Sequence, residues 1–104
     1  MQTISSPSIA EKLTAQLGNR LRLARLRRGF SMVQVAERAN ISRQTLGHLE
    51  SGDAGTSIGV LMRVLKVLSL DKDLDAVAKD DVLGRKLQDL ELDTPRQRAP
   101  RMAI

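Results

Sequence analysis

Two short amphipathic segments separated by a polar turn lie within residues 29–52. In the first, Val35, Ala36 and Ala39 share one face of a helix, and the small side chain of Ala36 allows another helix to approach closely. In the second, leucines recur at helical spacing among polar residues. The pattern predicts two consecutive helices, each with one buried face.

The boundaries of these two helices carry capping signals. Ser31 and Gln34 have the spacing of a capping box, in which each side chain bonds to the backbone N–H of the other residue. Asn40 suits the turn because Asn tolerates a left-handed backbone, and Ile41 is the apolar residue of that turn. Ser42 is a good N-cap, so the second helix is expected to begin there.

The helix after Ser42 has a polar outer face. Leu46, Leu49 and the aliphatic stem of Glu50 face inward at helical spacing. The outward positions are Arg43, Gln44, Gly47, His48 and Ser51. No apolar side chain lies on this outer face, which leaves it available for a polar partner.

A long first helix is predicted over residues 8–28. Ser8 and Glu11 form a second capping box, and Gly29 ends the helix. Gly18 weakens the middle by ~1 kcal/mol relative to Ala, so the helix is expected to begin in earnest only after it. The inward stripe consists of Leu13, Leu17, Leu21 and Ala24.

Two more helices are predicted after residue 52. The fourth follows a flexible turn and is capped by Ser57. Its core stripe consists of Ile58, Leu61, Val64, Leu65 and Leu68. A short fifth helix is expected over residues 71–79. These segments together predict an all-α chain.

Residues 17–68 resemble the Xre/Cro family of helix-turn-helix repressors, whose pattern runs Gly-Leu-Thr-Gln, Leu-Ala, Val-Ser-x-x-x-Ile and Glu-x-Gly. The matching positions are Gly29, Phe30, Ser31, Val35, Ala36, Ile41, Ser42, Leu46, Glu50 and Gly52. The resemblance implies a five-helix lambda-repressor-like domain that binds duplex DNA as a transcriptional repressor. It also implies a structural ion pair between Arg25 and Glu50.

The same resemblance places Arg43, Gln44 and His48 at the positions that read bases in the major groove. Arginine can bond guanine O6 and N7 together, and glutamine can pair similarly with adenine, each worth ~1–3 kcal/mol of discrimination. A lone exposed histidine is most often inert, but on this face His48 is expected to contact a base or a phosphate. Gly47 either lets the helix press close to DNA or has no such role.

Contacts to the DNA backbone are expected around this face. The candidates are Ser31, Met32, Arg38, Ser42, Thr45, Gly55, Thr56 and Ser57. Ser42 and Thr45 either touch phosphate or cap the helix, and backbone N–H groups of residues 55–57 can be offered to a phosphate. Met32 departs from the family pattern, which has Gln there, so only its backbone N–H remains as a donor. Phosphate contacts position the protein without specifying sequence.

The fourth helix has more apolar surface than one core face can use, because Val60, Met62 and Val67 lie off its main stripe. Surplus apolar surface often binds a partner. We therefore expect a homodimer whose interface includes Val60, Val64 and Val67 and which binds a palindromic operator with half-sites about one DNA turn apart. The alternative is that a few exposed valines have no function.

Composition adds limits to this interpretation. A chain of 104 residues forms one small domain, and it has no cysteine, which is compatible with a reducing cytoplasm. No segment has the pattern of a signal peptide or a membrane span, so we expect a cytoplasmic, nucleoid-associated protein without a membrane partner. Phe30 is the single aromatic residue, which favours duplex DNA over stacking on single strands.

The net charge of +5 is unevenly distributed. Residues 20–43 hold seven arginines and one acidic residue, whereas residues 71–93 hold four basic and eight acidic residues. The basic segment coincides with the helix-turn-helix pattern, so phosphate neutralisation would supply much of the affinity and make it salt dependent. The alternative is that these arginines only keep the helices soluble.

Residues 80–104 form a C-terminal extension, which we expect to be partly disordered. Leu83, Leu87 and Leu90 make an amphipathic stripe too short to stand alone. Residues 81–90 and the Arg/Pro-rich tail resemble the C-terminal ends of HipB-type antitoxins, small Xre-type dimers that repress their own operon and hold a HipA-like kinase toxin inactive. Some relatives insert a tail aromatic into the toxin, and this tail has none. Its arginines, from Arg96 to Arg101, are a solubilising tail, a DNA-grazing arm or a partner contact.

An enzyme is the competing class. Without cysteine and with one histidine, the chain cannot assemble the usual nucleophile–base pairs or metal clusters, so no catalytic residue, metal or cofactor is expected. A stand-alone Xre-family repressor without a toxin and a helical protein-interaction adaptor remain as alternatives. The predicted organisation is a flexible N-terminus (1–8), a DNA-binding domain (9–79) and the extension (80–104).

Overall fold

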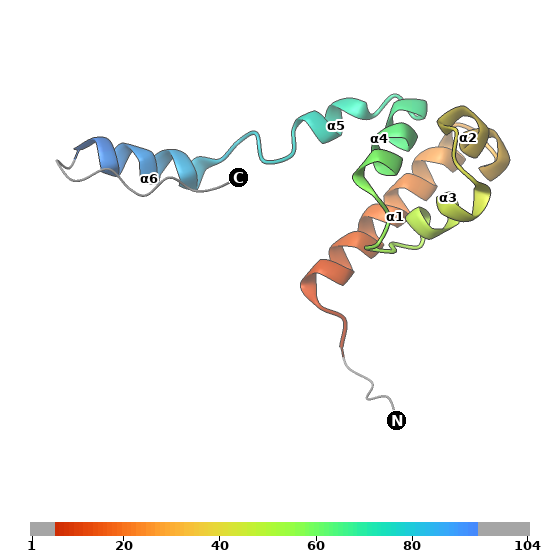
Figure 1. The fold of residues 1–104 in the computed structure, drawn as a ribbon, viewed down its shortest axis with the longest axis horizontal. Coiled ribbons are helices and arrows are strands. Elements are labelled where there is room, and N and C mark those ends of the chain that lie inside the picture. Colours follow the sequence, from red (N-terminus) through yellow and green to blue (C-terminus); the bar gives the residue numbers. More distant parts are fainter. Residues whose placement is uncertain (1–5, 94–104) are drawn as a thin grey trace.

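The computed structural model describes residues 6–93, and every regular element in that range is a helix (Figure 1). The helices are α1 (Ile9–Arg27), α2 (Met32–Ala39), α3 (Arg43–Glu50), α4 (Ile58–Val67), α5 (Asp71–Asp75) and α6 (Val82–Asp93). The all-α prediction is confirmed. Five helices belong to the predicted domain, and α6 is a sixth, within the predicted extension.

Helix α1 begins at the predicted capping box. Ser8 Oγ accepts the backbone N–H of Glu11 at 3.1 Å, and the Glu11 carboxylate accepts the Ser8 N–H at 3.5 Å. The helix runs without interruption through Gly18, so the expectation that it begins after that glycine is wrong. The absence of a side chain there serves packing, because a Cβ on Gly18 would lie 2.6 Å from the carbonyl oxygens of Leu49 and Glu50.

The core lies between α1, α2, α3 and α4. Helix α1 packs against α3, while α2 contacts both α3 and α4, and α4 also contacts α5. The buried apolar residues are Leu21, Ala24, Val35, Ala36, Ala39, Leu46, Leu49, Val64, Leu65 and Leu68. The inward positions predicted for the two central helices are therefore confirmed.

Two predicted core residues lie at the surface. Leu13 is 58% exposed. It belongs to the N-terminal part of α1, and this end of α1 extends beyond the other helices (Figure 1). Ile58 is 74% exposed at the first residue of α4, where the helix has only just left the preceding loop. Helical spacing predicts the face of the helix on which each residue lies. It does not predict how far along that face the other helices of the bundle extend.

Helix α4 corrects the predicted dimer surface. Val64 is 1% exposed and belongs to the core of the bundle, so it cannot line an interface with a second molecule. Val60 and Val67 are half-buried and pack against that core, whereas Met62 is 45% exposed. Most of the surplus apolar surface expected on α4 is thus used inside the chain, where α2 and α5 cover it.

The chain leaves the bundle after α5. This helix ends at Asp75 instead of continuing to residue 79, and Ala78 adopts a left-handed backbone with φ of 61°. Helix α6 then lies apart from the bundle (Figure 1). Residues 1–5 and the arginines of the tail lie outside the described residues. Within residues 6–93 no helix combines the length and apolar character needed to cross a membrane.

Candidate nucleic-acid interface

Helix α3 is anchored to α1 by the ion pair between Arg25 and Glu50, as predicted. Arg25 Nε and Nη2 donate to the two carboxylate oxygens of Glu50 at 2.7 and 3.0 Å, and Nη1 donates to the Phe30 carbonyl at 3.1 Å. Both side chains are nearly buried. The hydrogen bond to Glu50 raises the pKa of Arg25 above its ordinary value, against the opposing effect of burial. The pair fixes the C-terminal end of α3 relative to α1.

The outward face of α3 carries the three predicted base-reading residues. Arg43, Gln44 and His48 are exposed, while Leu46 and Leu49 on the opposite face are buried. Arg43 and Gln44 occupy the first turn of the helix, and His48 follows one turn after Gln44. A polar helical face held rigidly from behind is suited to insertion in the major groove.

His48 has an acidic neighbour that the sequence did not reveal. Its Nδ1 lies 3.5 Å from Oδ2 of Asp53, and both side chains are about half exposed. The other oxygen of Asp53 accepts the backbone N–H of Gly55 at 2.8 Å, which closes the turn after α3. The contact places a carboxylate beside one of the three predicted base-reading residues. An Asp two residues before a Gly was the available signal for that turn.

The hydroxyl groups at the starts of α2 and α3 act as caps. Ser31 Oγ accepts the N–H of Gln34 at 3.1 Å, and Ser42 Oγ accepts the N–H of Thr45 at 3.0 Å. Ser42 Oγ and Thr45 Oγ1 also share a hydrogen bond of 2.7 Å. A hydroxyl that accepts at a cap still has one O–H to donate, so Ser31 keeps a donor that a phosphate can accept.

Met32 packs beside α3. It is half-buried and contacts the core, and its Cε lies 3.7 Å from the point where a Cβ on Gly47 would be. An alanine at position 47 would therefore make an ordinary contact with Met32. The Met32 side chain thus supports α3 from one side.

The loop before α4 uses two of its backbone donors internally. The N–H of Gly55 donates to Asp53, and the N–H of Thr56 donates to the Asp53 carbonyl at 3.1 Å. Ser57 Oγ caps α4 by accepting the N–H of Val60 at 3.1 Å. The backbone amides of Gly55 and Thr56 are thus occupied in the unbound structure. The groups left to meet a phosphate here are the hydroxyls and the first amides of α4.

Two interactions near the predicted site could not be read from the spacing of residues in the sequence. The guanidinium of Arg38 lies over the ring of Phe30, 4.7 Å from its centre. Arg63 of α4 donates to the carbonyl of Asn40 at 3.4 Å, and Asn40 has the predicted left-handed backbone. The first contact orients Arg38 at the surface. The second joins α4 to the end of α2, and no local signal predicted it.

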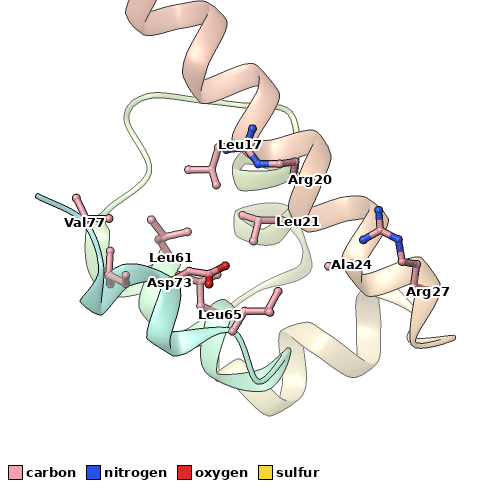
Figure 2. A pocket seen from close by; sticks show the side chains of 11 residues that line it. Leu17, Arg20, Leu21, Ala24, Arg27, Leu61, Leu65, Asp73 and Val77 are labelled. Carbon is pink, nitrogen blue, oxygen red and sulfur yellow. The ribbon is translucent and has the colours of Figure 1, made fainter. Parts of the chain in front are cut away.

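The arginines of residues 20–43 do not form one continuous basic face. Arg25 is buried in its ion pair, and Arg20 and Arg27 line a groove between α1, α4 and α5 (Figure 2). Arg43 is on the outer face of α3, and Arg38 is at the surface of α2. The basic charge is therefore divided between the helix-turn-helix side and the groove side of α1.

The fold and this surface define a helix-turn-helix protein. A model of the helix-turn-helix domain family matches residues 16–77, which is more than half of the chain, and the chain belongs to this family. It is a regulator of the DNA-binding helix-turn-helix class. No curated protein matches the chain. Among the described residues no group of His, Asp or Glu is arranged to hold a metal ion.

Proposed function

We propose that this protein is a sequence-specific repressor that reads duplex DNA with the outer face of α3. The observation that carries the proposal is the exposure of Arg43, Gln44 and His48 on a helix whose opposite face is locked to α1 by the Arg25–Glu50 pair. A helix held in one orientation loses little freedom on binding, so its side chains can meet base edges in a fixed register.

Phosphate contacts would surround this helix. Ser31 and Ser42 mark the starts of α2 and α3, and Ser57 marks the start of α4. Helix N-termini attract phosphate through their unpaired amides and the positive end of the helix dipole. Arg38 adds a cation near the same side. These contacts would position α3 on the DNA. Arg43 and Gln44 would then discriminate between base sequences.

The test is selection from a randomised duplex DNA library followed by binding measurements on the enriched sequence. Arg43→Ala and Gln44→Ala are each expected to weaken that binding by ~1–3 kcal/mol and to relax the preference at one base pair. Gln88→Ala on α6 provides a matched control for Gln44→Ala, because Gln88 is exposed and lies away from α3. Failure to enrich any sequence would contradict the proposal.

The finer proposal is that the repressor is the autoregulating antitoxin of a HipA-like kinase toxin and works as a homodimer on a palindromic operator. The resemblance of residues 81–90 to HipB-type antitoxins supports it, together with the exposure of Leu83 and Leu87 on α6, which another protein surface could cover. Purification of the tagged full chain from its host at moderate salt tests it. A stoichiometric kinase-like protein with DNA from the chain's own promoter is expected. DNA without that protein would leave a stand-alone repressor.

A helical adaptor that does not bind DNA is the other candidate. The exposed apolar residues of α6 favour it, because they can serve a protein partner without any role for α3. Arg43→Ala combined with Gln44→Ala separates the two functions. An adaptor would keep its protein partner with this variant, whereas the repressor would lose its operator while remaining folded.

A further inference from the structure

An apolar groove runs between α1 on one side and α4 and α5 on the other (Figure 2). It has a volume of about 470 Å³ and its walls are mostly leucine. Leu17 and Leu61 on its two sides are only partly buried, as is Leu74 of α5. Val77, at the mouth, is 68% exposed. Open leucine surface of this kind favours an apolar occupant.

Helix α6 has an apolar stripe of its own. Leu83 and Leu87 are 68% and 55% exposed and lie one turn apart, and Leu90 continues their face by helical spacing. Isolated helices of twelve residues are marginal in water, so α6 gains stability when this stripe is buried. Burial of Leu83 and Leu87 in the groove would therefore both stabilise α6 and cover the leucines of the groove.

The two surfaces agree in length. Twelve residues of α helix span about 18 Å at the usual rise per residue. The part of α1 that lines the groove, from Leu17 to Arg27, spans about 15 Å by the same rise. The stripe from Leu83 to Leu90 is shorter than this wall, so all of its leucines can be accommodated along the groove.

The charges at the edges also agree. Arg20 and Arg27 lie on the α1 side of the groove, and Asp73 lies on the α5 side. On α6, helical spacing puts Glu91 on one flank of the leucine stripe and Lys86 on the other. One orientation of α6 brings Glu91 to the arginines and Lys86 to Asp73. The reverse orientation would bring Glu91 to Asp73 and Lys86 to the arginines, so these charges favour the first direction of docking.

After α5 the chain leads α6 away from α1, α4 and the other helices of its own bundle (Figure 1). Residues 76–81 are held by local contacts. Lys79 pairs with Asp75 at 3.3 Å, Arg85 pairs with Asp80, and Asp81 Oδ1 accepts the N–H of Gly84 at 2.9 Å. With these contacts in place α6 is presented outward. A second copy of the chain is then the molecule that can receive it.

We propose that α6 of one copy docks in the groove between α1, α4 and α5 of a second copy, and that two chains exchange these helices about a twofold axis. This inference rests on the homodimer of the proposed function. It places the contact between the two chains at α6 and the groove instead of at the valines of α4. Exchange fills both grooves, so a small chain gains two contact regions with one partner.

Sedimentation of the full-length chain in the absence of DNA tests the contact. The unaltered chain is expected to be a dimer, and Leu87→Glu is expected to weaken dimerisation by about tenfold or more. Leu92→Glu is the matched control, since Leu92 is 76% exposed and lies on the opposite face of α6 by helical spacing. A monomeric unaltered chain overturns the proposal, as does a dimer that Leu87→Glu leaves intact.

Disulfide trapping identifies which α6 helix occupies the groove. The natural chain has no cysteine that could interfere. Chains with Arg20→Cys and chains with Glu91→Cys, differently tagged, are expected to cross-link to each other after mixing. Arg20→Cys with Lys86→Cys is the control pair, because Lys86 faces the other wall. Self-linkage of Glu91→Cys chains would show paired α6 helices, and an intrachain disulfide in the double variant would show self-docking. Either result overturns the exchange.

DNA binding by the same variants separates this inference from the proposed function. If Leu87→Glu is monomeric and binds the selected duplex more weakly but with the same base preference, both proposals stand. If the cross-link forms and no duplex is selected, the exchange stands and the repressor function fails.

Discussion

Helices α3 and α6 are both amphipathic by sequence, but their apolar faces have opposite surroundings. Leu46 on the apolar face of α3 is 0% exposed, whereas Leu83 on the apolar stripe of α6 is 68% exposed. Helix α3 contacts α1 and α2, and its last residue is joined to α1 by an ion pair. The difference shows that an amphipathic pattern predicts a helix and its apolar face, but not which surface covers that face.

The largest expected effect comes from breaking the ion pair that holds α3. Arg25→Ala leaves Glu50 buried without its partner, which costs about 3–5 kcal/mol of folding free energy. Because the folded pKa of Arg25 is raised, its contribution is present below the unfolded pKa and is lost only when the pH rises through the folded value. Urea unfolding near neutral pH should therefore report the full loss. An unchanged midpoint would show that the pair does not stabilise the bundle.

Leucine truncation compares the two helices directly. Leu46→Ala is expected to destabilise the bundle by about 2–5 kcal/mol, because it removes a fully buried side chain and leaves a cavity. Leu92→Ala, on the exposed outer face of α6, is expected to change stability by less than about 0.5 kcal/mol. Urea unfolding followed by circular dichroism measures both. Similar losses in the two variants would contradict the contrast between α3 and α6.

Glycine substitution tests whether close packing is confined to the bundle. Gly18→Ala forces a Cβ against backbone carbonyls and is expected to destabilise the protein by about 1–3 kcal/mol, although alanine favours a helix. Gly47→Ala has room and is expected to stabilise α3 by up to about 1 kcal/mol. Thermal unfolding gives the sign of each change. A rise in stability on Gly18→Ala would mean that the higher helix propensity of alanine outweighs the clash of its Cβ with the backbone carbonyls of α3.

The smallest effect concerns the caps. Ser31→Ala removes the cap of α2 and is expected to cost about 1 kcal/mol in global stability. Asp81→Ala removes the side chain that accepts the Gly84 N–H at the start of α6, and is expected to leave global stability within about 0.5 kcal/mol. Amide hydrogen exchange should instead show faster exchange in α6 alone. An equal acceleration of amide exchange in the helices of the bundle would contradict this expectation.

Much of the fold was predictable from the sequence because its signals are local. The capping boxes at Ser8 and Ser31 and the left-handed Asn40 involve contacts within a few residues, and all three occur in the structure. The outward face of α3 followed from helical spacing. The Arg25–Glu50 pair joins residues far apart in sequence, and it was predictable only from a family resemblance.

The sequence by itself determined the N-caps of α1 to α4, the inward faces of α2 and α3, and the polar side chains that α3 presents. Tertiary structure alone decided that Gly18 admits the backbone of α3, that Val64 serves only the core and no dimer interface, and that Asp53 lies beside His48. It also decided that an open leucine groove forms between α1, α4 and α5. The physical reason is range: caps and helical faces depend on neighbours within about one or two turns, whereas close approach, burial and grooves depend on segments that meet only after folding.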